Sequence, residues 1–202
     1  ATKTLGQILA GNYKAASVFD RYELDFCCGG KKTLEEACQR KQLSLEEIEN
    51  DLTRVLADSS GEFPFRDMSP SMLIGYILIH HHFYIQQNMP LILQHLEKVA
   101  CKHGESFPYM KRVVELFTEL EEELMGHMKK EELILFPAIR EIERLHTAGT
   151  SIESSLKNIT APMMVMEKEH DIAGRLIEEI RRLTSQYVVP EAACTTFRIS
   201  LM

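Results

Sequence analysis

The sequence lacks several features that mark particular classes of protein. Its 202 residues contain no apolar run of the roughly 18 residues that a membrane-spanning helix needs. The opening stretch ATKTLGQILAGNY has no basic segment followed by an apolar block, so no secretory signal is expected. Basic charge is not in excess either. The formal net charge of −7 argues against general binding to nucleic acid or anionic membranes.

Cysteines are few, and their spacing does not suit a disulfide framework. There are five, an odd number, and Cys27 and Cys28 are adjacent. Neighbouring Cα atoms lie about 3.8 Å apart, whereas a relaxed disulfide needs roughly 4.4–6.8 Å. We therefore expect free thiols, or thiols that face a third group, and a reducing, cytoplasmic compartment. The alternative is a pair of small buried residues in a helical turn. The isolated cysteines receive no role from the sequence: Cys38, Cys101 and Cys194.

Strand patterns are nearly absent, and apolar residues recur with the 3.6-residue period of helices. Residues 1–57 predict a small helical domain with one helix near Tyr13–Tyr22. Two further helices are expected to start at the capping boxes Thr33-x-x-Glu36 and Ser44-x-x-Glu47. Residues 58–70, rich in Ser, Gly and Pro, predict an interdomain linker.

Residues 71–202 predict an antiparallel up-down four-helix bundle whose fourth helix is cut short. Ser69 can cap the first long helix, and Pro70 suits its first position. Prolines inside the first two long helices, Pro90 and Pro137, are expected to kink them rather than end them. The expected spans are 70 to about 103, 109 to 144, and 162 to 186, followed by a stub that starts at Pro190 and Glu191.

Each long helix carries a histidine within an apolar stripe. In the run His80-His81-His82, successive side chains turn by about 100°, so one of the three can face a given line. His82 shares the cleanest apolar line, with Leu78, Ile85, Met89, Leu93 and Leu96, and we expect it to point inward.

On the second helix, His127 and Glu131 stand four residues apart, hence on one face, and interrupt the stripe. His170 lies among the apolar residues of the third helix. A single histidine in such a stripe is usually a core residue with a hydrogen-bond partner. Three of them on neighbouring helices, beside a carboxylate, would cost several kcal/mol to bury unpaired. A metal ion satisfies them all. Imidazole and carboxylate suit iron, with zinc, manganese or nickel as alternatives.

Three stretches now carry a resemblance to a known family: DFCCGGKKTL near the front, HMKKEELILFP around His127 and MEKEHDIAG around His170. Together they resemble the iron–sulfur cluster repair proteins of the YtfE/ScdA type, over nearly the whole chain. That family joins a short N-terminal cysteine domain to a haemerythrin-like di-iron bundle. The resemblance carries the metal-ligand role over to His82, His127, Glu131 and His170.

The family's fourth helix supplies a second H-x-x-x-E element, and this sequence has none after His170. Two interpretations stay open, a chain cut short before that element or a member with fewer ligands and a single metal. The stub favours the first, because half a helix would leave the other three with an exposed groove.

The resemblance implies repair of iron–sulfur clusters damaged by nitrosative or oxidative stress, with damaged iron–sulfur proteins as partners. The di-iron centre would donate iron, handle nitric oxide or both, and a nitric oxide reductase-like activity would fit. No nucleic acid or membrane partner is expected, and a homodimer is left open. The alternative function is a haemerythrin-like carrier or sensor of oxygen or nitric oxide, without repair. A metal-free helical adaptor would leave the aligned histidines unexplained.

Supporting roles can be assigned around these ligands. Cys27 and Cys28 precede a helix start and the basic Lys31 and Lys32, which favours thiolates that pass on iron, accept electrons or bind nitric oxide. Glu123, Glu167 and Glu169 are candidates for groups that orient the ligands or line an exit path for iron, although each taken singly is more often a solvated surface charge.

Overall fold

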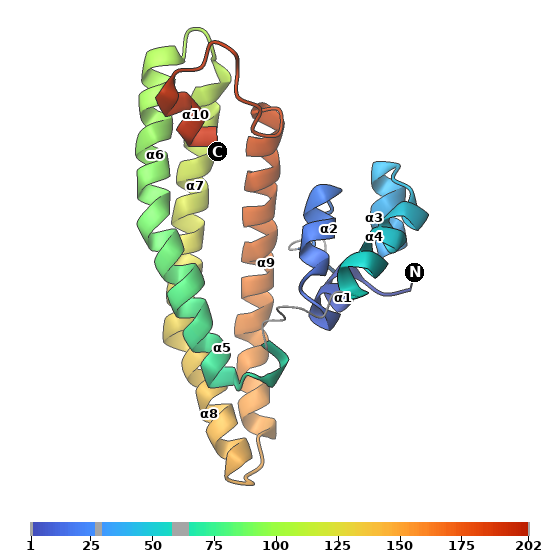
Figure 1. Ribbon diagram of the computed structural model, residues 1–202. Coiled ribbons are helices and arrows are strands. Elements are labelled where there is room, and N and C mark those ends of the chain that lie inside the picture. The colour runs from blue at the N-terminus through green and yellow to red at the C-terminus, as the bar shows by residue number, and fades with distance from the viewer. Residues whose placement is uncertain (1, 27–29, 58–64, 202) are drawn as a thin grey trace. The chain divides into compact units, whose positions relative to one another are not determined.

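The computed structural model describes residues 2–26, 30–57 and 65–201, and within them every regular element is helical (Figure 1). The chain divides into two compact units, residues 1–66 and 67–202. No helix in the described ranges is both long enough and apolar enough to cross a membrane. Cys27 and Cys28, and most of the predicted linker, lie outside the described residues.

The first unit contains four short helices, α1 (Leu5–Gly11), α2 (Ala15–Arg21), α3 (Leu34–Lys41) and α4 (Leu45–Ala57). The last three are at the predicted places. α1 was not predicted, although Thr4 and Gln7 form a full capping box at its start, with backbone-to-side-chain distances of 3.0 and 3.1 Å.

The expected capping box at α3 is confirmed, because Thr33 and Glu36 exchange both of their hydrogen bonds. At the start of α4 the Ser44 hydroxyl accepts from the Glu47 N–H at 3.4 Å. A backbone bridge joins Thr4 to Thr33 and ties the two helix starts together. Beside it the Gly6 N–H donates to the Gly30 carbonyl at 2.9 Å, and a Cβ on Gly6 would lie 3.1 Å from that oxygen. The unit closes over ten buried residues: Leu5, Ala15, Val18, Phe19, Leu24, Leu34, Ala37, Cys38, Ile48 and Leu52.

The second unit begins with a long helix at the predicted place. α5 (Pro70–Ile77) starts at Ser69, whose hydroxyl accepts from the backbone N–H of Met72. A π-helical turn, Leu78–His82, then leads into α6 (Phe83–His103), and Pro90 lies inside α6. The turn after α6 needs a glycine, since a Cβ on Gly104 would stand 2.3 Å from the Ala100 carbonyl oxygen.

The second long helix also follows the prediction, and it too contains a π-helical turn. α7 (Tyr109–Lys130) passes through the turn Glu131–Leu135 into α8 (Phe136–Thr147). Pro137 sits in the first turn of α8, directly after this widened turn. The sequence predicted neither π-helical turn.

The third long helix differs from its prediction at the N-terminal end. α9 (Glu153–Leu183) starts nine residues before Pro162, and the proline is inside it. The first turns of α9 are polar and largely exposed, so no apolar stripe marked them as helix. A proline in a helix interior removes one hydrogen bond, and the surrounding helix tolerates that loss here.

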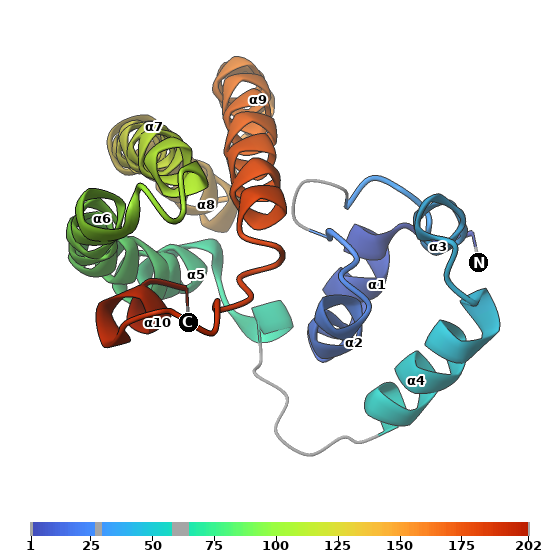
Figure 2. The ribbon, with the colours of Figure 1, turned by 90° about the horizontal axis from the view of Figure 1, so that it is seen from above.

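The fourth element, α10 (Thr195–Leu201), is shorter than expected. The Ala193 N–H donates to the Pro190 carbonyl at 3.0 Å, so the residues after Pro190 form a turn and helix begins later. α6, α7 and α9 stand side by side, and α10 packs against α6 at the end of the bundle away from α8 (Figures 1 and 2). The apolar core gathers at this end: Met89, Leu96, Val99, Met110, Val113, Leu116, Leu120, Ala173, Leu176, Ile180, Ala193, Phe197 and Leu201.

Candidate metal centre

The π-helical turn of the first long helix ends at His82, which is buried with only 4% of its surface exposed. His80 and His81, two residues and one residue earlier, are exposed, and their rings lie against Tyr76. The structure therefore places the three histidines as the apolar line predicts, with His82 inward. The ring of Phe136 stacks on His82 at 5.6 Å between centroids and fixes its plane.

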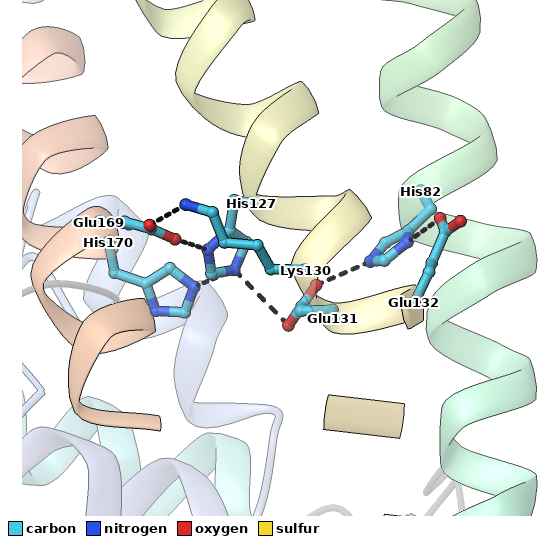
Figure 3. A network of polar contacts seen from close by, with 7 residues as sticks. All are labelled: His82, His127, Lys130, Glu131, Glu132, Glu169 and His170. Atoms are coloured by element: carbon cyan, nitrogen blue, oxygen red, sulfur yellow. Dashed lines mark hydrogen bonds and ion pairs between the residues drawn. The ribbon is translucent and has the colours of Figure 1, made fainter. Parts of the chain in front are cut away.

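His82 lies between two consecutive glutamates of the neighbouring helix (Figure 3). Its Nε2 is 2.9 Å from Oε2 of Glu131, and its Nδ1 is 2.8 Å from Oε1 of Glu132. Successive residues of a helix point about 100° apart, so the two carboxylates reach opposite sides of one ring. Both belong to the second π-helical turn.

His127 lies one helical turn before Glu131 and is also buried. Its Nδ1 is 2.9 Å from Oε2 of Glu169 on α9, and Lys130 forms an ion pair with the other oxygen of Glu169. Its Nε2 is 3.5 Å from Oε1 of Glu131. Both buried histidines therefore have Nδ1 on a carboxylate and Nε2 on Glu131.

Glu131 stands between the two buried imidazoles, with one oxygen toward each Nε2. Burial disfavours its charged form, but hydrogen bonding and the positive charge of His127 and His82 outweigh burial and lower its pKa. The hydrogen bond to Glu131, with a second to Glu169, raises the pKa of His127 against the effect of burial. In the metal-free protein the charges of Glu131 and His127 therefore stabilise each other.

His170 joins the group from α9, but it is not inside the core as the apolar stripe predicted. More than a third of the residue is exposed. Its Nε2 is nevertheless 3.0 Å from Nε2 of His127. Desolvation of the ring and the neighbouring charge of His127 lower the pKa of His170.

The donor set fits a divalent cation by its chemistry. Three carboxylates (Glu131, Glu132 and Glu169) and one ammonium group (Lys130) leave two negative charges for the imidazoles, or a cation in place of their protons, to balance (Figure 3). The two Nε2 atoms of His127 and His170, 3.0 Å apart, share one proton in a hydrogen bond, and a cation in its place would take a lone pair from each nitrogen. As the side chains lie, no three such groups in the described ranges are placed to hold a metal ion together. They pair with one another instead, so binding requires these pairs to part.

The candidates for supporting roles have different places. Glu169 is in the network through its contact with Nδ1 of His127 (Figure 3), Glu123 is half-buried one turn before His127, and Glu167 is exposed on α9. Sequence reasoning missed Glu132 and Lys130. Their contacts run between helices, and no spacing within one helix announces them. The one hint in the sequence was that Glu131 is followed directly by a second glutamate, Glu132. In a regular helix the two side chains would point in different directions, so this pair alone did not predict that both reach His82.

Comparison with known proteins places both units. Residues 1–56 match the ScdA_N family, a domain of unknown function, and residues 74–201 match the hemerythrin HHE cation binding domain. The iron–sulfur cluster repair protein YtfE of Enterobacter sp. (strain 638) is 34% identical over 96% of this chain and 82% of its own length. The proteins of the same name from Escherichia coli (strain K12 / DH10B) and Shigella boydii serotype 18 match with the same identity and coverage.

Proposed function

Since the chain belongs to the family of the YtfE iron–sulfur cluster repair proteins, with an ScdA_N domain followed by a hemerythrin HHE cation binding domain, we propose that it repairs damaged iron–sulfur clusters. Its partners would be iron–sulfur proteins damaged by nitric oxide or oxidants, and its compartment the cytoplasm. The observation that carries the proposal is the shared orientation of the two buried histidines. Both turn Nε2 toward Glu131 while a carboxylate holds Nδ1.

Four residues would hold the iron: His82, His127, Glu131 and His170. A carboxylate on Nδ1 fixes the histidine tautomer that leaves Nε2 free for a metal, and it makes that nitrogen a better donor. Glu132 does this for His82, and Glu169 for His127. Glu131, with one oxygen toward each imidazole, would supply the carboxylate of the centre beside both histidines.

Iron held by imidazole and carboxylate keeps open positions for a small ligand such as nitric oxide or oxygen. Residues around the proposed site control how water and small ligands reach it. Phe136 stacks on one side of His82 and shelters it from water. Lys130 forms an ion pair with Glu169, so the carboxylate that contacts Nδ1 of His127 is itself held in place.

Donation of iron needs a side from which the ion can leave. His170 supplies it, because this ligand is exposed while His82 and His127 are buried. Glu167, three residues before it, is exposed on the same helix. Iron would therefore be released on the α9 side, where a ligand can turn away without opening the core.

Cys27 and Cys28 would receive or pass on this iron, or carry electrons to it. Nearby basic residues favour thiolates there. The start of α3 contributes less than the sequence suggested, because the Glu36 carboxylate already accepts the Thr33 N–H at 2.8 Å. The positive end of that helix is therefore partly satisfied by its own capping box.

Metal analysis and the visible spectrum of freshly purified protein test the centre. We expect bound iron, and for an oxo-bridged pair absorption in the near ultraviolet and visible. Function is tested by adding the iron-loaded protein to a cluster-depleted dehydratase and measuring its activity.

Recovered activity with loss of iron from the donor supports repair. A protein that binds oxygen or nitric oxide reversibly but restores no activity is a carrier or sensor. A protein with neither iron nor an absorption band is not a metal protein, and the proposal fails.

A further inference from the structure

A thiol and an imidazole meet at the α10 end of the bundle, away from the histidine–glutamate network (Figure 1). Sγ of Cys194, the residue before α10, lies 3.2 Å from Nε2 of His103, the last residue of α6. This is hydrogen-bond distance for sulfur. Both residues are partly exposed, although Cys194 also packs against the apolar core, so the exchange proposed below requires the exposed side of the residue to admit a small molecule.

Aromatic packing fixes the imidazole in this position. The His103 ring lies 6.0 Å from the ring of Phe197 and 6.5 Å from that of Phe107. Those two phenylalanines meet edge to face at 5.1 Å, and Phe197 is fully buried. Nε2 is therefore held at the sulfur by a rigid support and does not reach it by a chance rotation.

We propose that Cys194 is a thiol–disulfide exchange site with His103 as its proton acceptor, and that its substrate is a low-molecular-weight disulfide. The Sγ–H proton passes to Nε2 as the sulfur attacks one sulfur of the disulfide. A new S–S bond forms and the old one breaks. The leaving thiolate takes the proton from the imidazolium, so one mixed disulfide and one free thiol result. The added disulfide is the only oxidant required.

Two other cysteines of the described residues provide internal comparisons. Cys38 is buried in the core of the first unit, and burial raises the pKa of its thiol. Cys101 is more exposed than Cys194, and within the described part of the chain it has no imidazole at hydrogen-bond distance. Exposure alone would make Cys101 the faster of the two, whereas an adjacent base makes Cys194 faster.

Modification should also loosen α10. A mixed disulfide at Cys194 removes the contact to His103, next to the buried residues Ala193 and Phe197 that dock this helix. The connection from α9 is strained, because Ser185, Gln186 and Tyr187 all have left-handed backbone angles, with φ of 50°, 61° and 61°. The packing of α10 against the bundle offsets that strain, so weaker packing would let residues 185–187 relax.

The test uses the full chain and oxidised glutathione at neutral pH, with adducts followed by peptide mass spectrometry. Trypsin places Cys194 in residues 183–198 and Cys101 in residues 99–102, so each site is measured separately. We expect Cys194 to be modified faster than Cys101. In His103→Phe, which keeps an aromatic ring beside Phe197, the rate at Cys194 should fall at least about tenfold while the rate at Cys101 stays unchanged.

Damage to the fold cannot imitate this result. If His103→Phe merely detached α10, Cys194 would become more exposed and react faster, not slower. Equal rates at the two cysteines, or a Cys194 rate that does not fall in His103→Phe, would overturn the exchange site. Hydrogen exchange over α10 should rise after modification, with Cys194→Ser treated in the same way as the control. Unchanged exchange in the adduct would overturn the loosening of α10.

Discussion

At the α10 end of the second unit, α6, α7 and α9 meet through apolar side chains, while toward α5 and α8 the same helices meet through histidines and glutamates. The apolar end is held mainly by burial of apolar side chains. The polar part costs free energy to bury, and its groups offset that cost by pairing with each other. The same helices therefore carry two different parts: an apolar end that stabilises the fold and a polar part that is suited to bind a metal ion.

The π-helical turns belong to the polar part only. One ends at His82 and the other starts at Glu131, so both interrupt regular helix where a site residue must be aimed. At the apolar end α6 and α7 run as α-helix without a π-helical turn. Around the second turn, Leu133 and Ile134 are 76% and 53% exposed, which shows that the turn orients carboxylates at the expense of apolar burial.

The sharpest way to break this division is to damage the apolar end. Leu116 is 3% exposed, and Leu116→Ala should cost about 2–5 kcal/mol of unfolding free energy through the cavity it leaves. Chemical denaturation measures this change. Leu91→Ala on exposed α6 surface is the control and should change stability by less than about 0.5 kcal/mol. Iron bound per folded molecule should be the same in both, and its loss in Leu116→Ala would mean that the two parts are not independent.

Damage to the polar part should have the opposite profile. In Glu131→Gln one histidine Nε2 faces an NH₂ group, so metal-free stability should fall by about 1–3 kcal/mol. The iron content should fall to a small fraction of the wild-type value, because the carboxylate between the two buried histidines is gone. Elemental analysis measures the iron content. Glu122→Gln, at an exposed position nine residues earlier on α7, is the control. Iron content equal to that control would remove Glu131 from the ligands.

Glu132→Gln sharpens the comparison within the polar part. It leaves the four ligands intact and weakens only the hold on Nδ1 of His82. We expect iron affinity to fall about tenfold, the low end for a group that orients a ligand, because the Glu132 side chain is 36% exposed. Competition with a chelator measures the affinity. A loss as large as that of Glu131→Gln would make Glu132 a ligand in its own right.

Most helix positions and the inward histidine followed from the sequence, because the apolar period and the caps act within one helix. Ser69, Thr33 and the line through His82 are such local signals. The pairing of Glu132 with His82 did not follow, since it depends on the register between helices and on a π-helical turn. The exposure of His170 was missed for the same reason. An apolar stripe shows which side of α9 faces its neighbours, but not how far those neighbours cover it.

The polar part should also respond to pH in a way that the apolar end cannot. His127 has a raised pKa, so its contribution to metal-free stability is present below about pH 6.5 and is lost as pH rises through the raised value. His170 has a lowered pKa and changes stability in the opposite direction. Iron displaces the proton that the raised pKa keeps on His127, so the stabilisation by iron should increase with pH.

The measured quantity is the difference in melting temperature between iron-loaded and metal-free protein at pH 6, 7 and 8. The gain is limited to about 1.4 kcal/mol per pH unit for each proton displaced. His127→Gln should flatten the dependence if it still binds iron at all. A difference that stays constant from pH 6 to 8 would show that iron binds without displacing protons from these histidines.

The smallest expected effect on the bundle comes from Cys27→Ser combined with Cys28→Ser. All four proposed ligands lie between residues 82 and 170, so iron content and melting temperature should match the wild type. Reactivation of a cluster-depleted dehydratase should nonetheless fail, because the iron can no longer be passed on or the centre reduced. Both thiols should also react with an alkylating agent in the folded protein, faster than buried Cys38. Slow alkylation with a large loss of stability would make the pair part of a core. Full repair by the double variant would instead mean that the first unit engages its partners through another surface.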